Sequence, residues 1–274
     1  MIDKWQNIYS LFDPVAFYIG SIAVHWYGIM YAFALLIAIF VAGWIIKLDK
    51  IDIKKEIFDG YIWWAEIGVI LGARIGYIVI YDKNSLYYLS HPWQMFNPYI
   101  NGTWTGISGM SYHGAIAGFL IASFLYTKKH KLSFWKLSDI AVVAIPVGYI
   151  FGRIGNFLNQ ELVGRVTDVP WGIYVGSLLR HPSQLYEAFL EGVVVFIILF
   201  YYRNKKRFNG ELTLLYAILY SIARIVSEIY REPDFQIGFL YGTSWLTMGM
   251  LSSFVVFSLA IALYYYIYSK IINR

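Results

Sequence analysis

The chain contains no cysteine among its 274 residues, which excludes disulfide bonds, thiolate metal ligands and a cysteine nucleophile. Any thiol in its chemistry must therefore belong to a substrate. Charged residues are also scarce: they make up 14% of the chain and hydrophobic residues 59%, whereas soluble globular domains carry about 25% charged residues. This composition excludes a soluble globular domain and indicates a polytopic membrane protein.

A second folded domain is not expected, because no polar stretch is long enough to fold separately. We therefore predict one membrane-embedded domain over 1–274. The first apolar segment begins near Ile19, runs past twenty residues and is followed by further apolar runs, so we do not expect a cleavable signal peptide. Neither a G-x-S-x-G nucleophile elbow nor an H-E-x-x-H zinc helix occurs, and neither a metal nor a cofactor is predicted.

Seven apolar stretches are long enough to cross a bilayer, whose hydrocarbon core of about 30 Å needs roughly 20 helical residues. The sequence therefore predicts an all-α fold with seven transmembrane helices. The connection at 82–109 is too polar and too rich in turn residues to span. The predicted spans lie at about 19–46, 57–81, 110–127, 138–158, 184–202, 211–230 and 245–268.

The distribution of Lys and Arg predicts the orientation of these spans. The connections at 47–56, 128–136 and 203–207 hold four Lys or Arg residues each, and the tail from Ser269 holds two more, against five on the opposite side. Since cations are enriched on the cytoplasmic side, we predict the N-terminus outside and the C-terminus in the cytoplasm. These short clusters account for the net charge of +5, so no nucleic-acid partner is expected.

Small residues recur at a spacing of four within several predicted spans, which lets helix backbones approach closely. They are Gly68, Gly72 and Gly76, then Gly114 and Gly118, then Gly148 and Gly152. We expect these glycines to pack helices together.

Three arginines lie inside predicted spans, where a guanidinium costs at least about 2.5 kcal/mol and needs a partner or a water-filled site. At 1.5 Å per helical residue, Arg74, Arg153 and Arg224 lie about 25, 22 and 20 Å above the cytoplasmic ends of their spans. The same count puts Tyr27 about 12 Å and His113 about 5 Å below the outer ends of theirs. All five residues therefore fall in the outer half of the membrane.

Spacing along the helices predicts how some polar side chains pair. Two pairs share a helical face, Arg224 with Glu228 and Arg153 with Asn156. Glu187 and Glu191 also share a face, and both are candidates to pair with an arginine. One interpretation is that such pairs only hold helices together, and for the two glutamates a structural and a functional role are equally open. Several guanidinium groups at headgroup depth suit phosphate oxygens, however, so we expect a phospholipid headgroup site in a lipid enzyme or a lipid transporter that opens outward.

The stretch GRIGNFLNQELVGR (152–165) resembles the signature of bacterial prolipoprotein diacylglyceryl transferases. Further blocks of that family occur in order across essentially the whole chain. They are HWYG (25–28), GARIGY (72–77), SYHG (111–114), RHPSQLYE (180–187) and ARIVSEIYREPD (223–234). The chain departs from the family at Gln160, where many members carry glycine.

The resemblance implies an enzyme of the bacterial cytoplasmic (inner) membrane with its active site in the outer half. Its reaction transfers the diacylglyceryl group of phosphatidylglycerol to the lipobox cysteine of a prolipoprotein signal peptide. This step forms a thioether, releases glycerol phosphate and begins lipoprotein maturation. The lack of cysteine agrees with it, because the substrate protein supplies the thiol.

The residues that match the family's functional positions fall into two groups. Those implied in catalysis are Tyr27, His113, Arg153, Arg224 and Glu228. Those implied in substrate binding are Arg153, Asn156, Glu161, Gly164, Arg231, Arg74 and Tyr220. We expect Arg153 and Arg224 to bind the phosphate and stabilise the leaving group, with Glu228 orienting Arg224. His113 is the candidate general base for the thiol.

A phospholipid flippase or transporter is the alternative from another functional class. Such a protein would favour paired half-repeats and polar residues on both sides of the membrane midplane. Here the polar residues are predicted in the outer half, which favours an enzyme.

Overall fold

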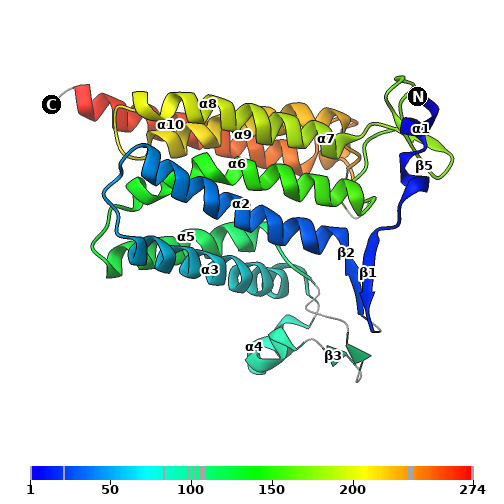
Figure 1. Cartoon of the computed structure of the whole chain (residues 1–274), viewed down its shortest axis with the longest axis horizontal. Coiled ribbons are helices and arrows are strands. Elements are labelled where there is room, and N and C mark those ends of the chain that lie inside the picture. Colours follow the sequence, from blue (N-terminus) through cyan, green and yellow to red (C-terminus); the bar gives the residue numbers. More distant parts are fainter. Residues whose placement is uncertain are drawn as a thin grey trace. The chain divides into compact units, whose positions relative to one another are not determined.

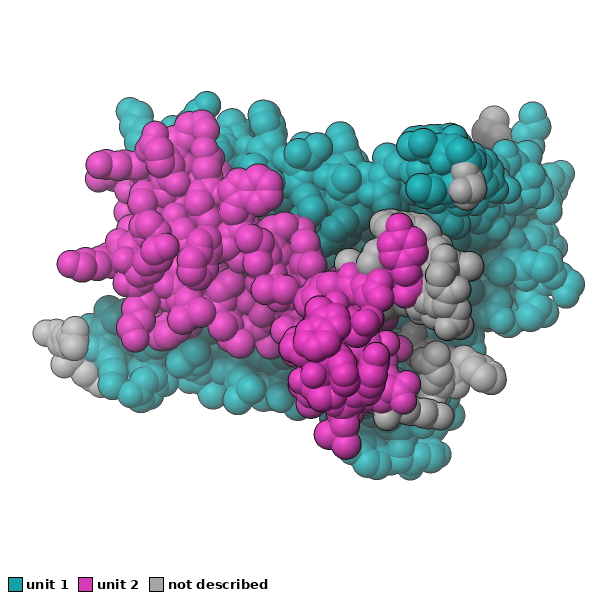
Figure 2. Space-filling view, turned by 90° about the horizontal axis from the view of Figure 1, so that it is seen from below, with its two compact units in different colours: residues 1–50, 138–274 teal, residues 51–137 magenta. Residues whose placement is uncertain are grey.

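The structure is a computed structural model, and it describes residues 2–20, 22–82, 84–97, 99–100, 103–104, 109–233 and 237–272 (Figure 1). The chain forms two compact units, which Figure 2 colours separately. Unit 1 comprises residues 1–50 and 138–274, and unit 2 comprises residues 51–137. The single domain over 1–274 stays a prediction.

Most of the described chain is helical, and six helices in it are long and apolar enough to cross a membrane. They are α2 (Trp26–Leu48), α3 (Lys55–Tyr81), α6 (Phe134–Leu158), a continuous run of α7 (Ser183–Glu187), a π-helical turn (Ala188–Val194) and α8 (Val195–Tyr202), then α9 (Glu211–Tyr230) and α10 (Met248–Ile272). These helices confirm the polytopic membrane class. The third predicted span coincides with α5 (Tyr112–Lys129), which has 18 residues, ends in two lysines and is not among the six. Seven spans therefore stay a prediction.

Shorter elements join these helices, and some of them are strands, which corrects the expectation of a purely helical fold. The helical ones are α1 (Ile2–Gln6), α4 (Ser85–Ser90) and the 3-10 turns Ile8–Leu11, Pro92–Phe96, Arg203–Lys205 and Leu240–Gly242. In the described part of the chain the strands form three antiparallel pairs: β1 (Val15–Ile19) with β2 (Ile22–His25), β3 (Tyr99–Ile100) with β4 (Thr103–Trp104), and β5 (Ile173–Val175) with β6 (Leu178–Arg180).

The β1–β2 hairpin also corrects the start of the first predicted span. The sequence places that start near Ile19, but Ile19 ends β1 and α2 begins only at Trp26. Gly20 follows β1 with a φ of 61°, a left-handed conformation that favours glycine. Between Ile19 and Trp26 only Gly20, Ser21 and His25 are not apolar, so hydropathy averaged over a span does not separate strand from helix. Tyr27 accordingly lies in the first turn of α2 and not about 12 Å below its end.

In unit 1, α2, α6, the α7–α8 run, α9 and α10 lie alongside one another (Figure 1). Gly148 of α6 packs against α2, because an added Cβ would lie 2.8 Å from the carbonyl oxygen of Ala34. A Cβ added at Gly152 would have no atom of the described residues within 4 Å, so the predicted packing role of Gly152 is wrong. The N-terminal segment joins this unit through a buried apolar cluster of Tyr9, Phe157 and Ile173.

In unit 2, α3 and α5 are antiparallel neighbours whose backbones meet at glycines. An added Cβ on Gly72 would lie 2.7 Å from Cα of Gly118, and one on Gly76 would lie 2.6 Å from Cα of Gly114. Real side chains do not fit at such distances. The predicted packing role of these glycines is therefore confirmed.

Candidate active site

Unit 1 contains three arginines and three glutamates that pair with one another, called here the charged cluster. They come from α6, the α7–α8 run, and α9 with the residue after it. The members are Arg153, Glu187, Glu191, Arg224, Glu228 and Arg231. The side chains of Glu187 and Glu191 are 0% exposed and those of the arginines 11% to 14%. Charges buried this deeply in apolar helices are tolerated because they pair.

Glu187 joins two of these arginines. Its Oε2 forms an ion pair of 2.8 Å with Nε of Arg153 and accepts a hydrogen bond of 3.2 Å from Nη1 of Arg224. Glu191, one turn later, lies 3.8 Å from the same Nη1. Guanidinium groups from α6 and α9 are thus held together by carboxylates from a third helical run.

Arg153 is oriented further by its own helix. Its Nε donates to the Tyr149 hydroxyl at 2.7 Å, and that hydroxyl donates to Oε2 of Glu191 at 2.5 Å. Its Nη1 donates to Oδ1 of Asn156 at 3.2 Å, as their shared helical face predicts. Its Nη2 takes no part in a hydrogen bond or ion pair with the described residues. Arg153 therefore keeps two N–H donors for a ligand.

Arg224 is fixed from the other side by Glu228, with which it forms the ion pair that their spacing predicts. Thr247, just before α10, donates to Oε2 of Glu228 at 2.7 Å. Gly249 lies against the same carboxylate, since an added Cβ would be 2.6 Å from Cδ of Glu228. Nη1 of Arg231 lies 3.8 Å from Oε1 of Glu228. The orientation of Arg224 therefore depends on contacts from α9 and from the start of α10.

The helix that carries the two bridging glutamates is irregular at this point. The π-helical turn Ala188–Val194 begins directly after Glu187 and contains Glu191, and π-helical turns are rare and frequent at functional sites. Oε1 of each glutamate is buried and accepts no hydrogen bond from the described residues. Such oxygens are costly to bury. Their presence beside two arginines indicates a functional site more than a packing surface.

Glu161 organises the loop that follows α6. Its carboxylate accepts hydrogen bonds from Nδ2 of Asn156 at 2.7 Å and from Nδ2 of Asn159 at 3.3 Å. Its backbone carbonyl accepts a bond of 2.5 Å from Nε2 of Gln184. Since Asn156 also contacts Arg153, the loop is connected to the charged cluster through one side chain.

Gln160 shows how the chain accommodates its departure from the family pattern. Its φ is 57°, in the left-handed region that glycine adopts without strain. Its Nε2 donates to the carbonyl oxygens of Tyr9 at 3.0 Å and Phe12 at 3.1 Å. These two bonds offset the strain and attach the loop to the N-terminal segment.

Burial raises the pKa of Tyr9, and its hydrogen bond from Gln184 offsets only part of this rise.

Gly164 lies where the loop meets two other segments. Its N–H donates to the carbonyl of His181 at 3.0 Å, and it forms a β-bridge with Arg231. Arg165 continues this pairing, because its Nε donates to the carbonyl of Arg231 at 2.9 Å. Burial lowers the pKa of His181, and the Asp168 carboxylate offsets part of this.

We expect Gly164→Ala to lower the free energy of unfolding by about 1–3 kcal/mol, the usual cost of overpacking. The added Cβ would lie 2.6 Å from Cβ of His181 and 2.8 Å from the carbonyl oxygen of Tyr230. The β-bridge to Arg231 holds the backbone in place, so residue 164 cannot move away from these atoms. Thermal unfolding of the purified protein measures the effect. Gly28→Ala is the matched control, because nothing lies within 4 Å of its added Cβ. Equal Tm values for Gly164→Ala and the wild type would contradict this account.

Two predicted aromatic residues also lie at this site. Tyr27 stacks on Tyr31 with ring centroids 6.4 Å apart and is within electrostatic reach of Glu161 and Arg153. Tyr220 of α9 packs edge-on against the ring of Tyr149, with centroids 5.9 Å apart. Unit 1 thus brings together nine predicted residues: Tyr27, Arg153, Asn156, Glu161, Gly164, Tyr220, Arg224, Glu228 and Arg231.

The other two predicted residues, Arg74 and His113, belong to unit 2. Arg74 donates from Nε to the carbonyl of Met95 at 2.5 Å and from Nη1 to the carbonyl of Gly109 at 3.1 Å. These bonds attach α3 to the segment that follows it, which is a structural reason for an arginine in this span. His113 lies in α5, but its side chain is outside the described residues, so its place in the site stays a prediction.

The sequence interpretation missed Tyr149, Thr247 and Gly249. Tyr149 precedes Arg153 by four residues, and that spacing is the one signal that could have identified it. Thr247 and Gly249 reach Glu228 across the fold, and no local pattern marks them. The pairing of Glu187 and Glu191 with an arginine is confirmed.

A second buried network lies at the opposite end of α9. The Glu211 carboxylate accepts hydrogen bonds from Nη2 of Arg207 at 2.8 Å, from Tyr202 at 2.8 Å and from Tyr264 at 3.0 Å. Asp139 of α6 forms an ion pair of 3.0 Å with Lys206. Its carboxylates are buried and paired like those of the charged cluster, although the Arg207 side chain is 43% exposed. Glu211 lies 13 residues before Arg224 along α9, so the network offers controls at a distance from the charged cluster.

The comparisons with known proteins show the family of the chain. The family model for prolipoprotein diacylglyceryl transferase matches residues 14–266. A protein of Aliarcobacter butzleri named phosphatidylglycerol–prolipoprotein diacylglyceryl transferase is 64% identical over 263 residues, which are 96% of each chain. A protein of the same name from Campylobacter jejuni is 58% identical, and the match covers 99% of this chain and 100% of that protein. One from Campylobacter curvus is 55% identical, and the match covers 97% of this chain and 98% of that protein. The chain belongs to the prolipoprotein diacylglyceryl transferase family.

Proposed function

We propose that this chain transfers the diacylglyceryl group of phosphatidylglycerol to the thiol of the lipobox cysteine in a prolipoprotein signal peptide. The sulfur bonds to the glyceryl carbon and the bond from that carbon to the phosphate oxygen breaks. Glycerol phosphate leaves with the electron pair, and the thiol proton passes to a base. The observation that carries this proposal is the pair of guanidinium groups, Arg153 and Arg224, that share the buried carboxylate of Glu187.

The two arginines are proposed to stabilise the leaving group. The phosphate gains negative charge as the carbon–oxygen bond breaks, and preorganised donors aimed at that charge lower the barrier. A guanidinium fork suits phosphate oxygens. The Nη2 group of Arg153 has no hydrogen-bond partner among the described residues and supplies donors for this purpose. Burial strengthens their interaction with an anion.

Several neighbours are proposed as positioning residues that act through these arginines. Glu228 orients Arg224, and the Tyr149 hydroxyl, itself bonded to Glu191, orients Arg153. Tyr27 is proposed to take part in catalysis. The remaining members of the proposed set contribute to substrate binding: Asn156, Glu161, Gly164, Arg231, Arg74 and Tyr220.

His113 is proposed as the general base for the thiol, because imidazoles titrate near neutral pH. We expect His113→Gln to lower kcat by about 100-fold or more, the usual contribution of a general base, with a smaller change in KM. His130→Gln is the control, because His130 lies just after the end of α5 opposite to His113. Its ring packs against Tyr126 at a tilt, with centroids 4.3 Å apart. If His113→Gln keeps most of the wild-type turnover, another group accepts the proton.

We also propose seven transmembrane helices in the bacterial cytoplasmic (inner) membrane, with α5 as the third and with the N-terminus outside. The C-terminus then lies in the cytoplasm and the charged cluster in the outer half of the membrane. The absence of cysteine makes this orientation testable with single introduced thiols. Trp171→Cys should react with an impermeant thiol reagent in intact spheroplasts, and Lys205→Cys should react only after lysis. The reverse pattern would contradict the orientation.

The proposed reaction is tested by incubating the purified protein with phosphatidylglycerol and a lipobox peptide and following the peptide by mass spectrometry. A mass gain of one diacylglyceryl group is expected for the cysteine peptide and none for its Cys→Ser form. A lipid flippase would move lipid between leaflets and leave both peptides unchanged. An unchanged cysteine peptide would therefore rule out the transferase.

A further inference from the structure

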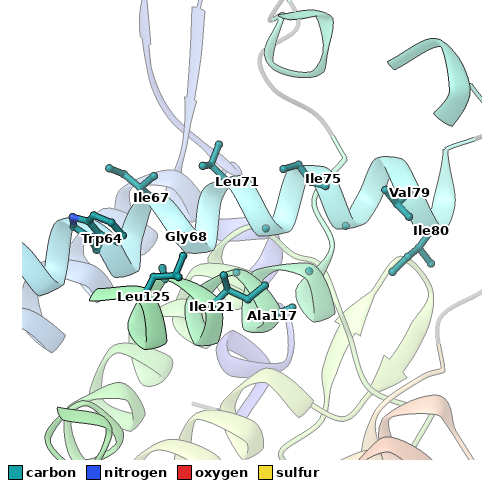
Figure 3. A pocket seen from close by; sticks show the side chains of 15 residues that line it. Trp64, Ile67, Gly68, Leu71, Ile75, Val79, Ile80, Ala117, Ile121 and Leu125 are labelled. Atoms are coloured by element: carbon teal, nitrogen blue, oxygen red, sulfur yellow. The ribbon is translucent and has the colours of Figure 1, made fainter. Parts of the chain in front are cut away.

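An apolar groove runs along the surface of unit 2 between α3 and α5 (Figure 3). Its volume is about 830 Å³, and apolar side chains and glycines line it. The large side chains along it are Trp64, Ile67, Leu71, Ile75, Val79 and Ile80 from α3 with Ile121 and Leu125 from α5. Ile75 is 41% exposed and Ile121 59%, so the groove is open and no part of the described chain fills it.

The glycine contact between the two helices explains this shape. Gly68, Gly72 and Gly118 bring the backbones so close that no side chain can stand between them. Backbone atoms therefore form the bottom of the groove, and the larger side chains of α3 and α5 form its two walls. Along α3 the lining residues run from Trp64 to Ile80, about 24 Å at 1.5 Å per residue, which is most of the depth of a 30 Å bilayer core.

One end of the groove is basic. The ammonium group of Lys129 lies 5.2 Å from the centre of the Trp64 ring, and Trp64 lines the groove. Lys128 and Lys129 form the last turn of α5, are exposed, and make no ion pair with the described residues. Across from them Lys55 is already paired with Asp59 at 2.5 Å. An acyl-sized apolar groove thus ends at two cations that have no carboxylate partner in the described chain.

We infer that this groove binds one anionic phospholipid, with an acyl chain along α3 and α5 and its phosphate against Lys128 and Lys129. Cations that flank an apolar membrane surface attract anionic headgroups. A signal peptide fits this charge less well, because it carries a positive segment on the cytoplasmic side, where the proposed orientation puts these lysines. The site lies within unit 2 and is distinct from the charged cluster of unit 1.

The inference is tested with a photo-reactive benzoylphenylalanine in the full-length protein, placed at Ile121 within the groove. Leu120 is the matched control position, since it is 47% exposed and adjacent but does not line the groove. The protein is reconstituted in vesicles of phosphatidylethanolamine with a minority of phosphatidylglycerol, and the adducts are identified by mass spectrometry. At Ile121 we expect the share of lipid adducts that contain phosphatidylglycerol to exceed the mole fraction of this lipid in the vesicles by at least about five-fold, because each lysine attracts anionic lipid. At Leu120 adducts should follow the mole fraction.

The pair of substitutions Lys128→Gln and Lys129→Gln should return the adducts at Ile121 to the mole fraction while leaving diacylglyceryl transfer within about two-fold of the wild type. Adducts at Ile121 that follow the mole fraction in the unsubstituted protein would overturn the proposal. So would preferential adducts with an added lipobox peptide. Because the labelling needs no peptide and no turnover, its outcome is independent of the transferase assay.

Discussion

Arg224→Lys should lower the rate of diacylglyceryl transfer by at least about 100-fold, although the positive charge is kept. Arg224 contacts Glu187 and Glu191 through Nη1 and Glu228 through Nη2. A lysine has a single ammonium on a flexible stem and cannot contact both sides at once. The phosphate would then lose an oriented donor at the point where its charge develops.

The measurement for this variant is kcat and KM for phosphatidylglycerol, together with the Tm of the purified protein. Arg207→Lys is the matched control, because Arg207 also pairs with a glutamate four residues away, Glu211, at the far end of α9. The control should keep transfer within about two-fold of the wild type. Near-normal transfer by Arg224→Lys would show that this guanidinium does not hold the phosphate.

Glu187→Gln should also abolish most of the transfer, and it should destabilise the protein. The carboxylate of Glu187 is 0% exposed and contacts Arg153 and Arg224. Without its charge the two cations repel each other, and breaking a buried pair typically costs about 3–5 kcal/mol. Both guanidinium groups would lose their common anchor, so we expect a loss of transfer of about 100-fold, as for a misplaced catalytic group.

A loss of folded protein alone would also lower transfer, so the comparison is with Glu211→Gln. Glu211 is a buried carboxylate of the same unit that pairs with Arg207. Both variants should have a lower Tm, but the specific activity of folded Glu211→Gln should stay within about two-fold of the wild type. Equal specific activities of the two variants would show that Glu187 is needed for stability alone.

Local spacing was sufficient to predict the pairs that lie on one helix. Arg224 with Glu228 and Arg153 with Asn156 follow from intervals of four and three residues, and both pairs are present. An arginine in an apolar span also predicts a partner, because the membrane offers no water to satisfy it. Arg74 also has partners, but they are backbone carbonyl oxygens in the segment after α3, and the spacing of side chains along the sequence does not predict such partners.

Features that depend on backbone geometry or on distant segments could not be predicted in this way. The strands β1 and β2 are largely apolar, as is the helix after them, so hydropathy predicts that the first span begins near Ile19 although α2 begins at Trp26. The π-helical turn at Ala188–Val194 leaves no hydropathy signal. The role of Glu187 as a bridge between two helices needs the tertiary fold, since Arg153 and Arg224 are 34 and 37 residues away from it.

A structure of the protein with phosphatidylglycerol bound is the most direct test of the central claim, that Arg153 and Arg224 hold the phosphate of the lipid. We predict phosphate oxygens within about 3 Å of a guanidinium nitrogen of each arginine, the ordinary distance of a hydrogen bond, with Glu187 still paired to both. A phosphate bound elsewhere, with both arginines paired only to Glu187, Glu191 and Glu228, would contradict the claim.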